Sequence, residues 1–411
     1  MTNSLITPTL IAKEALMQLE NNLVMGALVH REYKSEFSGG QGSTVQIRKP
    51  VKFLSQTGAT RVNQSVTESF TTITVDQRKH VSWKFATQDL TLSVEEYSER
   101  YIKPAAIALA QDVETSLTGL YSSVSQNVGT PGTPPATFLD MGAARRRLVE
   151  ASAPAGETIN AIIDPAAALS IANDLKAVTV NNNKVLTALE QVRVGKYAGM
   201  ELYEAQSLRV HQGGALGGTP AIDGNNQFLL DAAVTTTALS TNAQTLNIDG
   251  ASNSVTNWAR AGDVFTIQNV FAINPVTRQS TGRLMEFVVN AAANSSGGGL
   301  VALNISPQII TTGRYQNVNA GPVDGALITW KTTTNQNSVQ NLCFQKNAFA
   351  LVTVPLEMPD GAAFKARESH KGLSMRVVKD YDIDNDEDII RLDILYGVKT
   401  IYPELAVRLF G

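Results

Sequence analysis

Two neighbouring segments alternate apolar and polar residues over lengths that a paired ribbon cannot bury by itself. They are residues 43–54, STVQIRKPVKFL, and residues 66–85, VTESFTTITVDQRKHVSWKF, both rich in residues that favour strands. The polar stretch between them predicts a turn, and at about 3.3 Å per residue the two arms reach roughly 40–60 Å. Since an isolated two-stranded ribbon is only marginally stable in water, we expect another surface to cover it.

Helices are predicted on both sides of this ribbon. Residues 8–25 repeat apolar side chains with helical spacing, and Thr9 is the expected cap. This helix docks either on its own domain or on a neighbouring subunit, and the sequence leaves both open. Ser93 and Glu96 form a capping-box pattern, and Pro104 predicts the first turn of a longer helix with an apolar stripe.

The remaining two thirds of the chain change character twice. Residues 158–210 alternate helix and strand patterns, which indicates mixed α and β packing. Across residues 219–340 the charged fraction falls to about half of the chain average of 17%, and short alternating runs predict an inserted all-β domain. Residues 372–411 contain two alternating segments around an acidic turn, which predicts a hairpin with one buried face.

The charge and cysteine content of the chain exclude several classes of protein. Its 34 Lys and Arg against 37 Asp and Glu give a formal net charge of −3, which excludes a generally basic nucleic-acid coat. Cys343 is the single cysteine, so an intrachain disulfide and every multi-cysteine metal site are excluded. No apolar run reaches the roughly 18 residues of a membrane span, and the N-terminal segment lacks the pattern of a signal peptide. We therefore expect a soluble protein made in the cytoplasm.

None of the motifs that would carry catalysis is complete. The four histidines stand far apart, and the chain contains no phosphate-binding loop, nucleophile elbow or zinc-protease motif. Asp382, Asp384 and Asp386 match the first, third and fifth positions of a calcium loop. Glu387, however, stands where the loop requires Gly, and Asp393 where it requires a bidentate Glu. We favour a solvated acidic turn, with a cation-dependent hydrolase as a competing hypothesis.

Basic residues cluster at residues 48–52, 78–79 and 145–147. Aromatic side chains are scarce around them, which disfavours nucleic-acid binding, so we favour intersubunit ion pairs or plain solvation. The candidate intersubunit contacts are Arg48, Lys49, Lys52, Arg61, Arg78 and Asp249. We predict no catalytic, metal-binding or cofactor-binding residue.

The order of these elements resembles that of the major capsid (coat) proteins of tailed double-stranded-DNA bacteriophages. The segments that carry the resemblance are SERYIKPAAIALAQDVE (98–114), GKYAGMELYEAQSL (195–208) and RLDILYGVKTIYPELAVRL (391–409). The resemblance implies an α+β HK97-like phage capsid fold, in the P22-like coat branch that carries an inserted all-β barrel. The implied parts are an N-terminal arm (1–37), an extended E-loop hairpin (38–80), a P-domain with the spine helix (81–136), an A-domain (137–215 and 341–360), the inserted barrel (216–340) and a closing P-domain hairpin (361–411).

The resemblance also implies a function. Such a chain self-assembles as hexamers and pentamers into the icosahedral shell around a double-stranded DNA phage genome, as a scaffold-assisted procapsid that expands on packaging. It implies a scaffolding protein and a portal as partners, DNA enclosed without sequence-specific binding, no membrane and no cofactor, and assembly in the host cytoplasm into virions. Residues 240–256 are a candidate for contacts across subunits. The alternative is a virion surface adhesin or glycan-binding protein, which predicts aromatic side chains grouped on one face of the insert.

Overall fold

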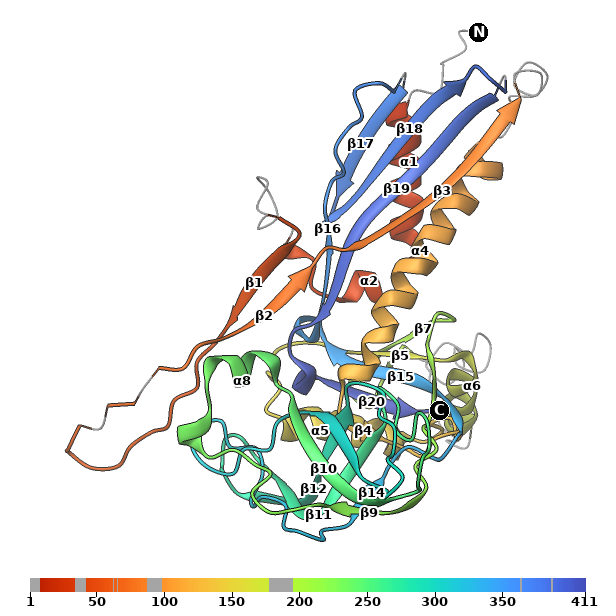
Figure 1. Ribbon diagram of the computed structural model, residues 1–411. Helices are drawn as coiled ribbons and strands as arrows, with labels where there is room; N and C mark the ends of the chain where they lie inside the picture. Colours follow the sequence, from red (N-terminus) through yellow and green to blue (C-terminus); the bar gives the residue numbers. More distant parts are fainter. Residues whose placement is uncertain are drawn as a thin grey trace. The chain divides into compact units, whose positions relative to one another are not determined.

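The structure is a computed structural model in which the chain forms two compact units (Figure 1). It describes residues 8–33, 42–61, 63–64, 66–86, 98–176, 195–362, 364–385 and 387–411. The helix–sheet unit comprises Met1–Val45, Thr72–Thr118 and Phe349–Lys399, and the barrel unit comprises Gln46–Thr71, Gly119–Ala348 and Thr400–Gly411. The expected capping box at Ser93 and Glu96 lies outside the described residues.

The helix–sheet unit is an antiparallel sheet with helices packed on one face (Figure 1). Its strands follow the order β16-β19-β18-β17, and β3 pairs with the free side of β19. Their bounds are β3 Gln77–Ala86, β16 Phe349–Thr353, β17 Phe364–His370, β18 Leu373–Asp382 and β19 Glu387–Thr400. Helix α1, Pro8–Asn22, packs on β17, β18 and the long helix α4, Lys103–Thr118, while the short α2, Met25–Leu28, contacts α4. The apolar side chains on the helix-facing side of the sheet, such as Val377 and Leu392, are buried.

Helices α1 and α4 form where the spacing of apolar residues predicted helices. Pro104 lies in the first turn of α4, which follows a π-helical turn over Ser98–Ile102, as the fixed φ of proline favours. Thr9 is not a cap, because α1 begins at Pro8 and already contains it. Glu114 sits within the apolar stripe of α4 and is buried, where its carboxylate accepts the backbone N–H groups of Met25 (3.0 Å) and Gly26 (2.8 Å). Burial raises the pKa of Glu114, and these hydrogen bonds act against that rise.

The predicted ribbon is shorter than its sequence pattern. Strands β1, Thr44–Lys49, and β2, Ser69–Thr74, form a two-stranded sheet. The expectation of a single strand over residues 66–85 is wrong, because the chain breaks after Thr74 and resumes as β3, which pairs with β19 along its full length. The alternation of apolar and polar residues continues from β2 into β3, because each of these strands has one covered face. The second half of the predicted ribbon is therefore covered by its own chain.

The barrel unit contains a seven-stranded mixed sheet. Its order is β4-β20-β15-β5-β7-β6, and β8 pairs with β15. The strands are β4 Asn127–Val128, β5 Ile159–Ile163, β6 Lys196–Tyr197, β7 Met200–Glu204, β8 Val210–Gln212, β15 Asn337–Gln345 and β20 Ala406–Phe410. Helices α5, Phe138–Glu150, and α6, Pro165–Lys176, share a hydrophobic core with this sheet through residues such as Leu148 and Ile171. The prediction of mixed α and β packing is confirmed.

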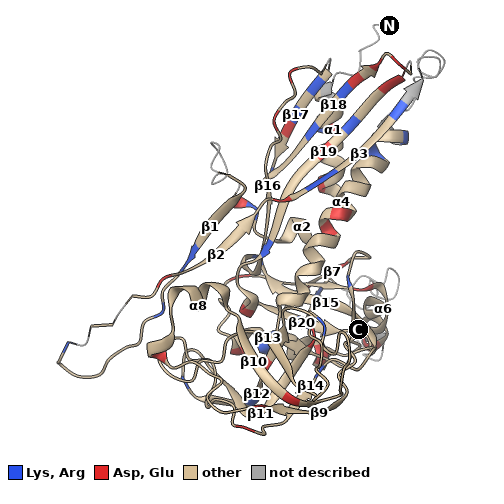
Figure 2. Ribbon diagram, viewed as in Figure 1, with Lys and Arg blue, Asp and Glu red and all other residues tan. Residues whose placement is uncertain are grey.

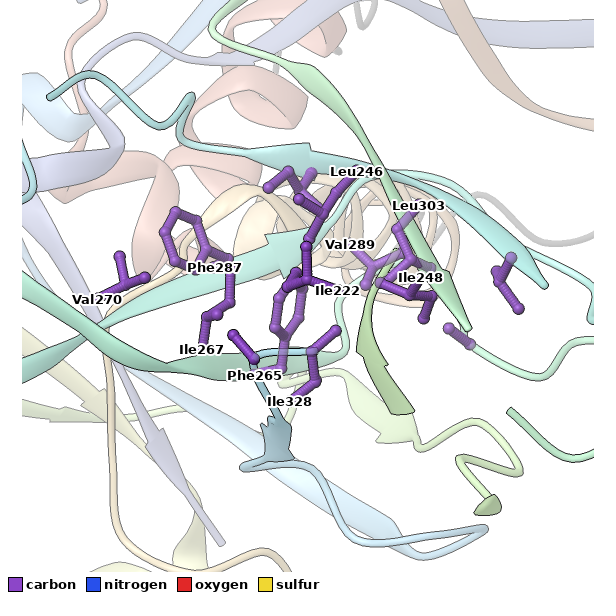
Figure 3. Close-up of a cluster of buried hydrophobic side chains, with 14 of the residues drawn as sticks. Ile222, Leu246, Ile248, Phe265, Ile267, Val270, Phe287, Val289, Leu303 and Ile328 are labelled. Carbon is purple, nitrogen blue, oxygen red and sulfur yellow. The ribbon is translucent and has the colours of Figure 1, made fainter. Parts of the chain in front are cut away.

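The insert is a closed barrel. Strands follow the order β14-β11-β12-β13-β10-β9, and an antiparallel bridge between Ala221 in β9 and Leu327 beside β14 joins the two ends. The bounds are β9 Gly218–Ile222, β10 Gln244–Ala251, β11 Val264–Ile273, β12 Ser280–Val289, β13 Val301–Ser306 and β14 Ile328–Trp330, with α8 at Thr236–Thr241. Leu246, Phe265 and Phe287 point into one buried cluster (Figure 3). The short alternating runs thus form a barrel whose inward residues make the core, as expected.

Two implied ranges need correction. Residues 361–411 are not one hairpin: β18 and β19 form the predicted hairpin around the acidic turn, but β20 pairs with β15 and β4 in the seven-stranded sheet. Residues 341–360 also divide, because β15 lies in that sheet while β16 pairs with β19. In both cases the partner strand is distant in sequence, so local alternation carries no information about the pairing.

Candidate assembly interface

An exposed loop joins the two ribbon strands. Between Pro50 and Glu68 the described residues contain no helix or strand, and most of their side chains are exposed. Phe53 and Val66 are each 61% exposed, an unusual position for large apolar side chains. Within the loop the side-chain amide of Gln64 makes two hydrogen bonds to the backbone of Leu54. It accepts the Leu54 N–H (2.9 Å) and donates to the Leu54 carbonyl. The loop therefore exposes the apolar side chains of Phe53 and Val66, and the hydrogen bonds of Gln64 stabilise its turn.

The predicted contact residues fall in three places. Arg48, Lys49, Lys52 and Arg61 belong to the ribbon and its loop, where Lys52 and Arg61 are exposed. Arg48 lies 3.6 Å from Glu68 with both side chains largely exposed, and the Lys49 ammonium lies 5.6 Å from the centre of the Tyr402 ring. An exposed ion pair of this kind contributes little to the stability of the subunit.

Asp249, the one acidic residue among the candidate contacts, is exposed on β10 of the barrel. Strand β10 lies between β13 and β9, so the central part of the candidate segment 240–256 is an internal barrel strand and not a projecting loop.

Arg78 has an intrachain partner. It lies 3.7 Å from Asp393, a fully buried carboxylate that also accepts from Arg376 (2.5 Å) and Arg391 (2.8 Å). Burial alone would raise the pKa of Asp393, but the two arginine hydrogen bonds outweigh it and hold the pKa below its ordinary value. These contacts count against the competing hypothesis in which Asp393 would complete a calcium loop.

The acidic turn itself is an ordinary hairpin turn. Asp382 accepts the N–H of Asp384 (3.0 Å) and the side-chain amide of Asn385 (2.8 Å), which is the local bonding expected at a tight turn. Asp386 lies outside the described residues. Among the residues that the structure describes, no group of three His, Cys, Asp or Glu is arranged to hold a metal ion.

The third basic cluster joins the barrel to the seven-stranded sheet and its helices. Arg147 on α5 lies 3.0 Å from Glu286 on β12, which is only 3% exposed and also lies 3.5 Å from Arg283. Glu286 further accepts the backbone N–H of Asn127 at 3.2 Å. The expectation of intersubunit pairing or plain solvation at residues 145–147 is wrong for Arg147, whose partner is in its own chain. Burial raises the pKa of Glu286, with Arg147 and Arg283 acting in the opposite direction.

A second buried polar cluster surrounds the point where the chain enters the barrel. His211 on β8 lies 2.8 Å from Asp263 through Nε2 and 3.1 Å from the Tyr121 hydroxyl through Nδ1. Arg408 on β20 donates to the carbonyl of Gly262 (2.6 Å) and to the side chain of Gln340. Burial lowers the pKa of Arg408 to about 10, so its guanidinium stays charged at neutral pH. Sequence reasoning missed this cluster, because its members are single polar residues far apart along the chain.

The barrel surface does not display the aromatic group that a glycan-binding insert requires. Trp258, Phe265 and Phe287 are fully buried, and Trp330 packs edge-on against Trp258 at 5.5 Å between ring centres. The large apolar side chains exposed on the barrel are aliphatic, such as Val276 and Val323. Charged residues are sparse along the barrel strands (Figure 2). The aromatic residues therefore serve the barrel core.

No helix in the described part of the chain is both long and apolar enough to cross a membrane.

Comparison with known proteins decides the family. The whole chain, residues 1–411, matches the family described as "P22 coat protein - gene protein 5". The chain belongs to the P22 coat protein family. Members of this family are structural proteins of a phage capsid, so this coat protein is a phage major capsid protein, a shell subunit of the virion and not an enzyme. It has the mixed α+β architecture expected from the order of its elements.

The coat protein is similar to one curated relative and to several solved phage structures. It is 22% identical over 421 residues to the "Major capsid protein" of Acyrthosiphon pisum secondary endosymbiont phage 1, covering 98% of this chain and 97% of the relative. A chain of Mycobacterium phage Che8 has 14% identity and a TM-score of 0.49, covering 94% of this chain and 90% of that one. A chain of the capsid of cyanophage P-SCSP1u has 11% identity and a TM-score of 0.45, covering 90% and 84%.

Proposed function

We propose that this coat protein assembles as hexamers and pentamers into an icosahedral shell that encloses a double-stranded DNA genome. Assembly proceeds in the host cytoplasm around a scaffolding protein and a portal, and the procapsid expands as DNA enters. The observation that carries the proposal is the exposed loop between β1 and β2, with Phe53 and Val66 each 61% exposed. Apolar side chains on an extended loop lose contact with water only when a second surface receives them.

The parts of the coat protein take the following roles in this proposal. Residues 1–37 form the N-terminal arm, and α4 is the spine helix. The E-loop ends near Val75 and not at residue 80, because β3 pairs with β19 from Gln77 onward. The barrel remains the inserted domain. Many modest contacts between copies then sum to a closed, symmetric lattice.

The formal net charge of −3 supports enclosure of DNA without tight binding. A strongly basic lining would hold phosphates and release them only at raised salt, which would hinder packing and ejection. The unassembled coat protein is accordingly expected to show no sequence preference when mixed with double-stranded fragments in a gel-shift experiment. A tight, sequence-dependent complex would contradict this part of the proposal.

The test of assembly compares two loop variants with a matched surface variant. Phe53→Ser and Val66→Ser remove the exposed apolar side chains of the loop, and Val323→Ser makes the same change at a barrel position that is 58% exposed. Sedimentation velocity and negative-stain microscopy, with scaffolding protein added, are expected to show shells for the wild type and for Val323→Ser. The two loop variants are expected to remain largely as folded subunits. Wild-type protein that stays in small uniform oligomers under these conditions would overturn the proposal.

A further inference from the structure

We propose that the inserted barrel positions the E-loop within its own subunit, through a bracket formed by Ser240, Arg314 and Tyr315. These residues hold the point where the loop returns into β2, so the loop leaves the subunit in a set direction before any neighbour is present. The inference rests on the proposed function, because it assigns the barrel a role in presenting the loop for assembly.

The bracket makes three directed hydrogen bonds to two residues of the returning chain, Thr67 and Phe70. The Arg314 guanidinium donates to the hydroxyl of Thr67 at 2.8 Å, and the Tyr315 hydroxyl donates to the carbonyl of Thr67 at 3.0 Å. The hydroxyl of Ser240, on α8, accepts the backbone N–H of Phe70 at 3.1 Å. All of these residues belong to the barrel unit, and α8 is seen beside the ribbon in Figure 1.

The bracket is itself rigidly attached to the barrel. Arg278, in the turn between β11 and β12, donates to the carbonyls of Gly313 (3.0 Å) and Arg314 (2.8 Å). Arg314 is almost fully buried, and the N–H of Ile310 donates to the side chain of Asn317 at 2.9 Å, closing the same loop. The donors that reach Thr67 therefore sit on a backbone that is fixed on both sides.

Helix α8 is tied down in the same way. The side chain of Gln308 donates to the carbonyls of Ala238 and Ala243, the latter at 3.1 Å. The Ser306 hydroxyl donates to the carbonyl of Asn242 at 2.7 Å, and Thr235 caps the first turn of α8. Ser240 is thus presented from a short helix that the barrel holds at its C-terminal end.

The loop's own contacts cannot set its direction. The Gln64 clamp joins two positions inside the loop, so it stabilises the turn and leaves its orientation free. The pair between Arg48 and Glu68 is largely exposed and contributes little. A loop of this length loses substantial conformational entropy when it docks, and fixing one end in advance reduces that loss. The bracket at residues 67–70 is the contact that achieves this.

The experiment uses hydroxyl deletions that leave apolar packing intact. The bracket variant is Ser240→Ala with Tyr315→Phe, and the matched control is Ser170→Ala with Tyr203→Phe, which removes the same two groups from α6 and β7. Thr67→Val removes the acceptor of Arg314, and Thr67→Ser keeps a hydroxyl and is the rescuing variant. Each full-length subunit is studied before and after scaffolding protein is added.

The first readout is hydrogen exchange in the unassembled subunit. Exchange at Phe70 is expected to rise roughly fivefold to tenfold in the bracket variant and in Thr67→Val, the effect of losing one or two hydrogen bonds. Exchange in β10 and β13 is expected to stay unchanged, which shows that the barrel remains folded. The control variant and Thr67→Ser are expected to behave as wild type. Unchanged exchange at Phe70 in the bracket variant would overturn the inference.

The second readout is the rate of assembly, followed by light scattering. The bracket variant and Thr67→Val are expected to assemble several-fold more slowly than the control and Thr67→Ser. Faster loop exchange together with a wild-type assembly rate would also overturn the inference, because the bracket would then hold the loop without serving assembly. Failure of the proposed function is distinguishable, since it would appear as the absence of shells in the wild type.

Discussion

Replacing Glu286 by Gln tests how the barrel is joined to the rest of its unit. The carboxylate is 3% exposed and lies within 3.5 Å of two arginines, Arg147 and Arg283. Gln keeps the size of the side chain and one oxygen for the N–H of Asn127, but it removes the charge that both arginines face. The variant therefore leaves Arg147 and Arg283, two partly buried cations, without the carboxylate that lies nearest to each of them.

The magnitude follows from that geometry. Removing one partner of a fully buried ion pair typically costs about 3–5 kcal/mol, chiefly because the remaining charge is left without compensation. The side chains of Arg147 and Arg283 are 18% and 24% exposed, so both keep some contact with water. We therefore expect Glu286→Gln to lower the free energy of unfolding by about 2–4 kcal/mol.

Urea denaturation of the unassembled subunit measures this change. Tryptophan fluorescence reports on the barrel, because Trp258 and Trp330 pack against each other there. Glu68→Gln, which removes one partner of an exposed pair, is the control and is expected to change stability by less than about 0.5 kcal/mol. The double variant Arg147→Met with Glu286→Leu is expected to cost about 1–3 kcal/mol less than the sum of its single changes. A loss below about 1 kcal/mol for Glu286→Gln would refute the reasoning.

Three further outcomes follow from buried groups. Phe287→Ala opens a cavity in the barrel core and is expected to lower unfolding stability by about 3–5 kcal/mol in chemical denaturation, and a loss near zero would contradict the barrel packing. Arg376 and Arg391 hold the pKa of Asp393 below its ordinary value of 3.8. The ionised carboxylate therefore stabilises the folded subunit fully above pH 3.8, and this contribution is lost as the pH falls below that value. Asp393→Asn should remove this loss from the acid side of a plot of unfolding free energy against pH. Burial raises the pKa of Cys343 to about 12, so a thiol reagent should label the folded subunit far more slowly than the urea-unfolded chain, and rapid labelling of the folded form would show the thiol to be accessible.

Local patterns predicted most of the elements of the fold. The spacing of apolar residues located α1 and α4, Pro104 marked the start of α4, and the alternating runs of the insert became the barrel strands β11 to β14. The hairpin of β18 and β19 was also recognisable, because both strands alternate around a turn of acidic residues. These features share one cause: each element has one buried face, and burial imposes a period on the sequence.

Strand pairing could not be predicted in the same way. Residues 66–85 alternate without interruption, yet β2 pairs with β1 and β3 pairs with β19, more than 300 residues away. Alternation records that a strand has a covered face and says nothing about which strand lies beside it. The same limit explains why β20 was placed in a hairpin that it does not join.

The candidate contacts were predicted unevenly for a related reason. Arg61 lies on the exposed loop, as its polar surroundings indicated. Lys52 lies there too, although the pattern placed it in a strand that in fact ends at Lys49. Arg78 and Arg147, by contrast, are paired with acidic residues far along the chain. A charged residue near others of the same sign suggests an exposed cluster, and only the folded chain shows a distant counter-charge. Ser240, Arg314 and Tyr315 were missed because single polar residues in a polar insert carry no distinguishing pattern.

A cryo-electron microscopy reconstruction of the particles formed with scaffolding protein tests the central claim most directly. We expect closed icosahedral shells of hexamers and pentamers, with residues 52–66 of each subunit lying against a neighbouring copy and Phe53 removed from solvent. We also expect the bonds from Ser240, Arg314 and Tyr315 to the returning strand to stay within the same subunit. Shells in which this loop faces solvent, or a uniform small oligomer with no closed particle, would contradict it.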